Sequence, residues 1–228
     1  VSDSSSLYSK SEGIENGIII APLAVTINGH TYKEYEDIKT KEFVDIINEG
    51  HIPSSSQPSI GEVLEIYDQY KDDEIINISM ADGLSGTYNS ACIAKGMAAN
   101  PERIEVINSK TLCGPHRYLV NLAVELVKEG KTKQEIVDNI NNALEDTKSY
   151  LIPHDFDFLV RGGRVSALVG KIGSAIKLVP VMTLSEDKQS LVKFATKRTF
   201  KKAINKIVEE MIECGVDSNY KIYITHAC

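Results

Sequence analysis

The sequence predicts an α/β fold in two parts, the first built on a mainly parallel sheet covered by helices. Short apolar runs rich in β-branched residues alternate, over the first 150 residues, with segments whose apolar side chains recur at helical spacing. Strand, helix and strand in repeating order favour parallel strands, because the helix returns the chain to the same end of the sheet. After Tyr150 this order changes, which predicts a second, smaller α/β part.

The strands and helices of the first part follow from local patterns. Strands are expected at 18–21, 23–27, 75–79 and 104–108, the last two (IINIS and IEVIN) being the clearest. Helices are expected from Ile60 to Tyr70, from Tyr88 to Ala99, from Leu119 to Lys128 and after Thr132. Two of these begin with capping-box pairs, Ser59 with Glu62 and Thr132 with Glu135. We place the first domain at 1–150.

The second part is placed at 151–228. A short strand, Tyr150-Leu-Ile-Pro, lies at the boundary and is followed by a segment rich in glycine and small residues. Strands are expected at 177–184 and 191–198, joined by the turn SEDKQS. An amphipathic helix follows, with Gly215 at its C′ position, and Lys221–His226 (KIYITH) is expected to be a strand.

Composition limits the function. The net charge of −7 argues against a nucleic-acid partner, since binding to phosphates needs clustered positive charge. The four cysteines are far apart and form no CxxC pair, as expected of free thiols in a reducing compartment. No apolar run approaches the roughly 18 residues of a membrane span, and the first residues do not resemble a signal peptide. We expect a cytoplasmic protein without stable membrane insertion.

Two hydroxyl-rich segments are the strongest candidates for a binding site. PSSSQPS (53–59) and MADGLSGT (80–87) each lead into a predicted helix, where ligands of α/β sheets bind. Exposed backbone amides together with serine and threonine hydroxyls can hold a carboxylate or a phosphate. The alternative is that these serines only cap their helices. The sequence leaves both interpretations open.

Sequence patterns for catalysis or metal binding are weaker than those for the hydroxyl-rich binding site. GLSGT resembles the G-x-S-x-G nucleophile elbow but has Thr87 in place of the last glycine, and no histidine motif supplies a base for Ser85. The five histidines have no metal-ligand spacing, so we expect them in loops or on the surface, and no nucleotide-binding motif is present.

Basic residues gather in the second part of this acidic chain. They form either a solvated face or a docking surface for an acidic or phosphorylated partner. These residues are Arg161, Arg164, Lys171, Lys177, Lys193, Lys197, Arg198, Lys201 and Lys202.

Seven segments, in order, together resemble the DegV family of fatty-acid-binding proteins, the binding subunits of bacterial fatty acid kinase. The similarity runs over essentially the whole chain. The segments are VSDSSS (1–6), APLAVTINGHTYKE (21–34), PSSSQPSIGE (53–62), GLSGTYNSA (83–91), RGGRVS (161–166), KLVPVMTL (177–184) and ATKRTFKKA (195–203).

The resemblance implies a two-domain α/β fold in which a long-chain fatty acid lies between the domains. Ser55 and Ser85 are expected to hold its carboxyl group, with Ser56, Gly86 and Thr87 as weaker candidates. The protein would be a carrier and not itself an enzyme, with no cofactor and no metal, and the catalytic subunit of a fatty acid kinase would be its partner. Arg198 matches an arginine tied to phosphoryl transfer with that kinase. The rival hypothesis is a serine-dependent enzyme acting on an acyl or phosphorylated small molecule.

Some positions depart from the family pattern. Ala81 and Asp82 stand where two serines are common, and Asp82 is unfavourable beside an anion unless it points away. Ser54 and Ser55 replace the usual threonines. Relative to the family the chain is expected to be truncated, without a C-terminal portion that contains a histidine near the acid group; His226 is not expected to substitute for it.

Overall fold

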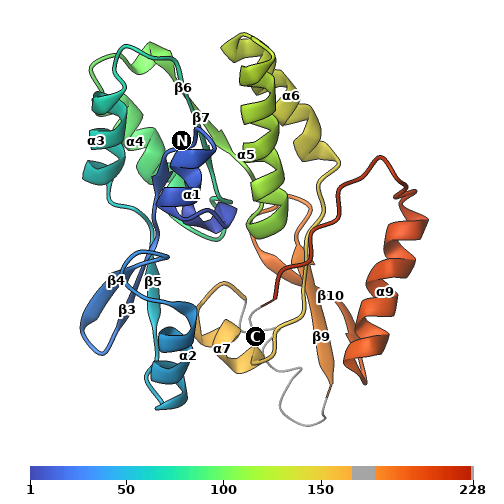
Figure 1. The fold of residues 1–228 in the computed structure, drawn as a ribbon. Helices are drawn as coiled ribbons and strands as arrows, with labels where there is room; N and C mark the ends of the chain where they lie inside the picture. The colour runs from blue at the N-terminus through green and yellow to red at the C-terminus, as the bar shows by residue number, and fades with distance from the viewer. Residues whose placement is uncertain (166–177, 227–228) are drawn as a thin grey trace. The chain divides into compact units, whose positions relative to one another are not determined.

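The computed structural model describes residues 1–165 and 178–226. They form two compact units, Val1–Thr147 together with Thr225 and His226, and Lys148–Ile224 (Figure 1). The domain boundary at residue 150 stays a prediction, because a compact unit of contacts is not by itself an independently folding domain.

The first unit alternates strands and helices as its sequence pattern indicates. In chain order its elements are β1 (Ser2–Asp3), the 3₁₀ turn η1 (Ser4–Ser6), α1 (Lys10–Glu15), β2 (Ile20–Ala21), β3 (Ala24–Ile27), β4 (His30–Lys33), α2 (Thr40–Asn48), β5 (Ser54–Ser56), α3 (Ile60–Gln69), β6 (Ile75–Ser79), α4 (Thr87–Met97), η2 (Pro101–Arg103), β7 (Ile104–Asn108), α5 (Cys113–Lys128) and α6 (Lys133–Glu145).

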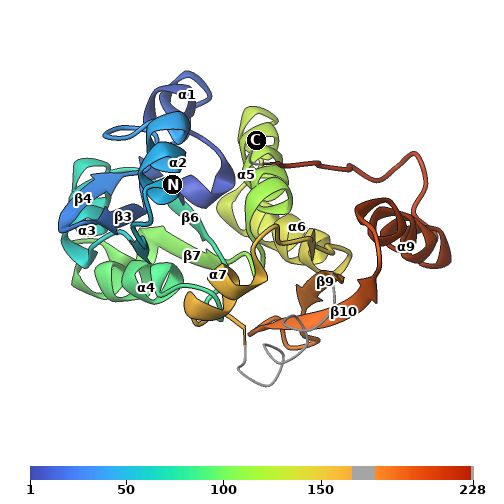
Figure 2. The same cartoon turned by 90° about the horizontal axis from the view of Figure 1, so that it is seen from below.

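A four-stranded parallel sheet with the order β2-β1-β6-β7 is the centre of this unit. Ile78 on one face packs with buried side chains of α5 and α6, including Leu119 and Ile140. On the opposite face Ile75 packs with Val63 of α3 and with residues of α4. Figure 2 shows the two helix pairs on opposite sides of the sheet. Helices thus cover both faces of the sheet, as parallel sheets require. This confirms the predicted α/β fold class.

A second, antiparallel sheet with the order β4-β3-β5 belongs to the same unit. The chain enters this sheet after β2. Ser55 lies on β5 and pairs with Val25 of β3. One face of this sheet is closed by α2, because Phe43 and Ile46 pack against Val25, Ile27 and Ile38. We call β3, β4, β5 and α2 the arm.

The second unit contains β8 (Tyr150–Leu151), α7 (Phe156–Arg161), β9 (Val179–Leu184), β10 (Leu191–Lys197) and α9 (Phe200–Glu213). The strands form an antiparallel sheet with the order β10-β9-β8, and α9 packs against it through the fully buried Ala203. The C′ position of α9 is Gly215, with φ of +74°, as predicted. Its neighbour Val216 donates to the carbonyl oxygen of Met211, which completes a Schellman motif.

Both predicted capping boxes of the first unit are present. The side chain of Ser59 accepts from the backbone of Glu62, and that of Thr132 accepts from Glu135, with the reciprocal carboxylate bonds made in each case. These local signals fix where α3 and α6 begin.

Several sequence-based expectations were wrong. Residues 221–226 form no strand, because a β pattern becomes a strand only when it pairs with a neighbour. Ser54–Ser56, expected in a loop, are strand β5, since their backbone pairs with β3. Helix α5 begins at Cys113 and not at Leu119. Helices α1, α2 and α7 were not predicted. Lys171, Lys177 and Cys228 lie outside the described residues.

Candidate functional site

The candidate site is built first from the loop that follows β6. This loop leads to α4, whose N-cap is Gly86 and has no side-chain capping bond. Ser85 is half-buried, and its Oγ lies 2.8 Å from Oγ1 of the buried Thr87. The amide of Thr87 donates to the same Ser85 hydroxyl at 3.3 Å. Ser85 and Thr87 therefore form one polar cluster at the first turn of α4, where backbone amides are unpaired within the helix.

The second segment is strand β5 and the turn after it. Ser54, Ser55 and Ser56 are exposed, and the residue that caps α3 is Ser59. Helix capping therefore does not account for the three serines of β5. The alternative interpretation of PSSSQPS as a cap applies to Ser59 alone.

A direct contact joins the two segments. A Cβ atom added to Gly86 would lie 2.7 Å from Nε2 and 3.0 Å from Cδ of Gln57. The side chain of Gln57, two residues after Ser55, therefore packs on the backbone beside Ser85. Glycine at this position allows the close approach. The structure thus brings together the segments of all five predicted binding residues, Ser55, Ser56, Ser85, Gly86 and Thr87. Gln57 was missed because the sequence alone does not indicate which loops meet.

The acidic residue in this loop is turned to the backbone. A carboxylate oxygen of Asp82 accepts a hydrogen bond of 2.9 Å from the amide of Gly83. Ala81 beside it is fully buried. This arrangement reduces the conflict that Asp82 would create with a bound anion.

A buried polar cluster at the start of the chain was not predicted. His116 of α5 is fully buried, which corrects the expectation that the histidines lie in loops or on the surface. Its Nδ1 lies 2.9 Å from the Ser5 hydroxyl, and its Nε2 lies 3.0 Å from the carbonyl oxygen of Ile78 and 3.1 Å from the Ser2 hydroxyl. The bonds are satisfied when Nε2 donates to Ile78 and Nδ1 accepts from Ser5. In the sequence, the polar run VSDSSS (1–6) was the only feature that could have indicated this cluster.

Two acidic residues of the first unit have shifted pKa values. Burial raises the pKa of Glu34, whose carboxylate accepts from Ser4, and the Asp3 charge raises it further. Glu62, in the first turn of α3, has a lowered pKa because Lys33 is hydrogen-bonded to it, with Nζ 2.5 Å from Oε1. Burial also raises the pKa of the Cys113 thiol.

Among the described residues no group of histidine, cysteine and acidic side chains could hold a metal ion.

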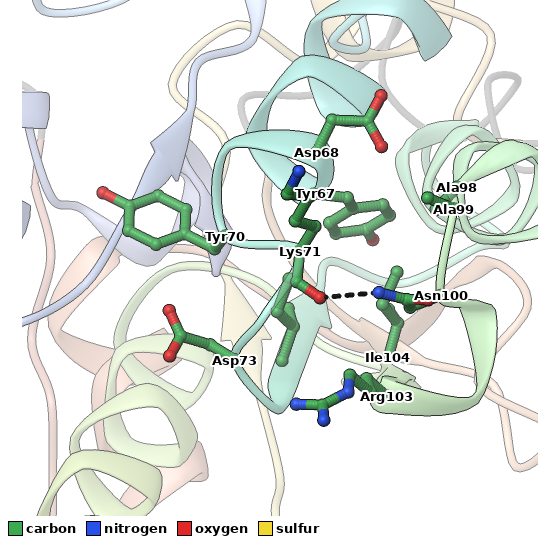
Figure 3. Close-up of a pocket in the computed structure, with 11 residues that line it drawn as sticks. Tyr67, Asp68, Tyr70, Lys71, Asp73, Ala98, Ala99, Asn100, Arg103 and Ile104 are labelled. Carbon is green, nitrogen blue, oxygen red and sulfur yellow. Dashed lines mark hydrogen bonds between the residues drawn. The ribbon is translucent and has the colours of Figure 1, made fainter.

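A small cavity lies elsewhere in the first unit (Figure 3). Its volume is about 10 Å³, and Tyr67, Ile75, Asn100 and Ile104 are among the residues that line it. This is the space of about one water molecule. Because Ile75 and Ile104 begin β6 and β7, the cavity is at the amino ends of the strands, whereas Ser85 follows the carboxyl end of β6. It is therefore not the candidate site.

Arg198 lies in the second unit, at the bend between β10 and α9. It is exposed and directly precedes Thr199, the N-cap of α9, whose hydroxyl accepts from the amide of Lys202. Within the part of the chain that the structure describes, no ion pair involves Arg198. The nearby Lys201 and Lys202 are also exposed.

In the described ranges, no histidine or acidic side chain is hydrogen-bonded to the Ser85 hydroxyl as a general base would be. There the Ser85 hydroxyl is hydrogen-bonded to Thr87, whereas His116 is bonded to the hydroxyls of Ser2 and Ser5 and to the carbonyl oxygen of Ile78. Residues 1–165 and 178–226 also contain no helix with the length and apolarity of a membrane span.

Known proteins resemble this chain over its whole length. Residues 1–228 match the family model described as "Uncharacterised protein, DegV family". The chain is 36% identical over 230 residues to a DegV domain-containing protein of Staphylococcus aureus strain N315, with 100% of this chain and 81% of that protein covered.

Two solved structures are similar in fold. One is a DegV family protein from Thermus thermophilus, described as binding fatty acid, with a TM-score of 0.83, 25% identity and coverage of 93% of this chain and 75% of that one. The other is DegV from Bacillus subtilis, described as a fatty acid binding protein, with a TM-score of 0.81, 30% identity and coverage of 93% and 76%. On this evidence the chain belongs to the DegV family.

Proposed function

We propose that this chain binds a long-chain fatty acid and presents its carboxyl group to a separate kinase, which converts it to an acyl phosphate for phospholipid synthesis. The observation that carries the binding proposal is the contact of Gln57 with Gly86, because it joins the turn after β5 to the loop that contains Ser85. Two solved relatives of at least 25% identity are described as fatty acid binding proteins, which supports the ligand class.

Neutral hydroxyls are suited to holding a carboxyl group that must later react with a kinase-bound phosphate. Ser55 and Ser85 donate to the carboxylate, and the amides at the start of α4 add a favourable field for an anion. Without a tight ion pair, a carboxylate oxygen stays available to attack a phosphorus atom. The acyl tail supplies the affinity, since burying roughly 15 methylenes at about 0.8 kcal/mol each gives on the order of 12 kcal/mol before the cost of ordering the chain.

The chemical step is assigned to the partner. In this proposal the kinase subunit supplies the nucleotide and its metal in the cytoplasm, and the present chain supplies the oriented acid. Arg198, exposed before α9, would stabilise the charge that develops during phosphoryl transfer. The exposed Lys201 and Lys202 beside it favour an acidic or phosphate-bearing partner.

Substitution of the two serines tests the proposal. We expect Ser55→Ala and Ser85→Ala each to weaken binding of a long-chain fatty acid by about 1–3 kcal/mol, because each removes a donor to the carboxylate. Isothermal titration calorimetry with a saturated and an unsaturated acid would measure this. A long-chain alcohol should lose much less affinity than the acid, since it lacks the negative charge.

Thr132→Ala is the matched control. It also removes a hydroxyl of the first unit, but one that caps α6. It should leave fatty acid affinity unchanged. Unchanged affinity in both serine variants would contradict the proposed head-group site. Hydrolysis of activated acyl esters that is lost in Ser85→Ala while lipid binding persists would instead support the serine-dependent enzyme.

A further inference from the structure

The first turn of the chain contacts the arm through Ser4. The buried hydroxyl of Ser4 donates to Oε2 of Glu34 at 2.7 Å and accepts from the amide of Leu23 at 2.9 Å. Glu34 in turn donates its amide to the carbonyl oxygen of Leu23 at 2.9 Å. Leu23 immediately precedes β3, and Glu34 immediately follows β4. One hydroxyl therefore holds both strands at the base of the arm.

The same turn contacts the Ser85 loop through Asp3. One carboxylate oxygen of Asp3, which is 2% exposed, accepts from the amide of Met80 at 2.8 Å. Met80 is the first residue after β6 and begins the loop that contains Ser85. Asp3 and Ser4 are adjacent, so the connection between the arm and this loop passes through one peptide unit.

The turn itself is held rigidly. The other carboxylate oxygen of Asp3 accepts from the amide of Ser5 at 2.9 Å, and the Ser6 hydroxyl donates to the carbonyl oxygen of Asp3 at 2.7 Å. The hydroxyls of Ser2 and Ser5 lie on opposite ring nitrogens of His116. Buried bonds of this kind are costly to break because the groups would lose their partners without gaining water.

We infer that Ser4 is a positioning residue for the head-group site: it sets the strand that carries Ser55 relative to the loop that carries Ser85. Leu23 lies only two residues from Val25, the partner of Ser55, a span of about 7 Å. A displacement at the base of the arm is therefore transmitted to Ser55 with little attenuation. Hydrogen bonds to a carboxylate tolerate only a few tenths of an ångström, so two donors serve one head group only when this spacing is kept.

Other contacts near the arm lie closer to the surface. Lys10 of α1 pairs with Glu36, between β4 and α2, at 3.1 Å, with 43% and 26% of their side chains exposed. Lys33 pairs with Glu62 at 2.5 Å, with 41% and 34% of their side chains exposed. Gln57, which touches Gly86, is also exposed. Exposed pairs contribute little to stability. The two bonds of the buried Ser4 hydroxyl are better protected from water than these contacts, so we assign to them the main constraint at the base of the arm.

The experiment measures amide hydrogen exchange of the ligand-free chain together with ligand affinity. In Ser4→Ala we expect faster exchange in three segments, 24–26, 54–57 and 80–86, whereas Thr132→Ala should not change any of the three selectively. Glu34→Ala removes the same bond from the other partner and should act like Ser4→Ala. Glu34→Gln keeps an acceptor for the Ser4 hydroxyl and should restore exchange towards that of the unaltered chain.

Affinity gives the second readout, and this part of the inference rests on the proposed function. Ser4→Ala should weaken binding of a long-chain fatty acid about tenfold, the size of one head-group hydrogen bond. It should have a smaller effect on the alcohol of equal length. In the double variant with Ser55→Ala the losses should not add, because the Ser55 hydroxyl is already misplaced.

Each result is decisive. Unchanged exchange in Ser4→Ala and Glu34→Ala, or strictly additive losses of affinity with Ser55→Ala, would overturn the positioning role. Coupled changes in exchange with no fatty acid binding by any variant would sustain the positioning role and reject the fatty acid proposal.

Discussion

Gly86 shows how one residue sets the separation of two binding segments. Its missing side chain allows Gln57 to lie against the backbone of the Ser85 loop, where a Cβ would be 2.7 Å from Nε2. Its backbone is not in the left-handed region, with φ of −73°. Steric contact, and not backbone strain, is therefore the reason for glycine here.

Gly86→Ala should consequently displace Gln57 and not unfold the chain. We expect a loss of fatty acid affinity of about 1 kcal/mol, comparable to one hydrogen bond, with little change in the denaturation midpoint. Gly61, where an added Cβ would meet no atom within 4 Å, provides the matched control Gly61→Ala. Equal affinity in the two glycine variants would show that the Gln57 contact does not matter for binding.

Glu34 makes stability depend on pH. Its pKa is raised above the ordinary value of 4.5, first by burial. The folded state therefore retains the proton to higher pH than the unfolded state. Its contribution is fully present below the unfolded pKa and is lost as pH rises through the folded pKa.

We therefore expect Glu34→Gln to remove part of the decrease in stability on going from about pH 4.5 to 7. Urea denaturation midpoints at a series of pH values would measure it. Asp3 faces the same carboxyl, and Cys113 and Tyr35 are within its electrostatic influence. A variant with the same pH slope as the unaltered chain would contradict this assignment.

Among helices and strands, the sequence predicts best those whose ends are determined by neighbouring residues. The capping boxes at Ser59 and Thr132 and the Schellman glycine Gly215 are determined by neighbouring residues, and all three are found. The strands Ile75–Ser79 and Ile104–Asn108 were predicted with their observed bounds, because both are short apolar runs in a sheet covered on both faces.

Elements that depend on distant partners were predicted poorly. Ser54–Ser56 is a strand only because β3 offers it a ladder, and KIYITH has the composition of a strand without forming one. For the same reason the buried cluster of Ser2, Ser5 and His116 could not be predicted, since it joins residues more than 100 positions apart.

Helix α6 allows a test of the local signals. Thr132→Ala removes its capping hydroxyl, and we expect the free energy of unfolding to fall by about 1 kcal/mol. Chemical denaturation monitored by circular dichroism would measure it. A change below a few tenths of a kcal/mol would mean that the Glu135 carboxylate alone satisfies the end of the helix.

For the whole molecule, the family establishes the fold, while the proposed activity divides between two proteins. Arg198→Ala should leave fatty acid affinity unchanged and lower acyl-phosphate formation with a fatty acid kinase subunit at least tenfold, since a charge-stabilising group is removed. Lys221→Ala, in a segment without regular structure, is the control for loss of a surface charge. Loss of lipid binding in Arg198→Ala would contradict the division of roles.

The most direct measurement is mass spectrometry of an organic extract of the purified protein, compared with a blank and with an unrelated protein prepared in the same way. The account predicts one long-chain fatty acid per chain, reduced in Ser55→Ala and Ser85→Ala. An extract without fatty acid from folded protein that also fails to take up added acid would contradict the proposed function.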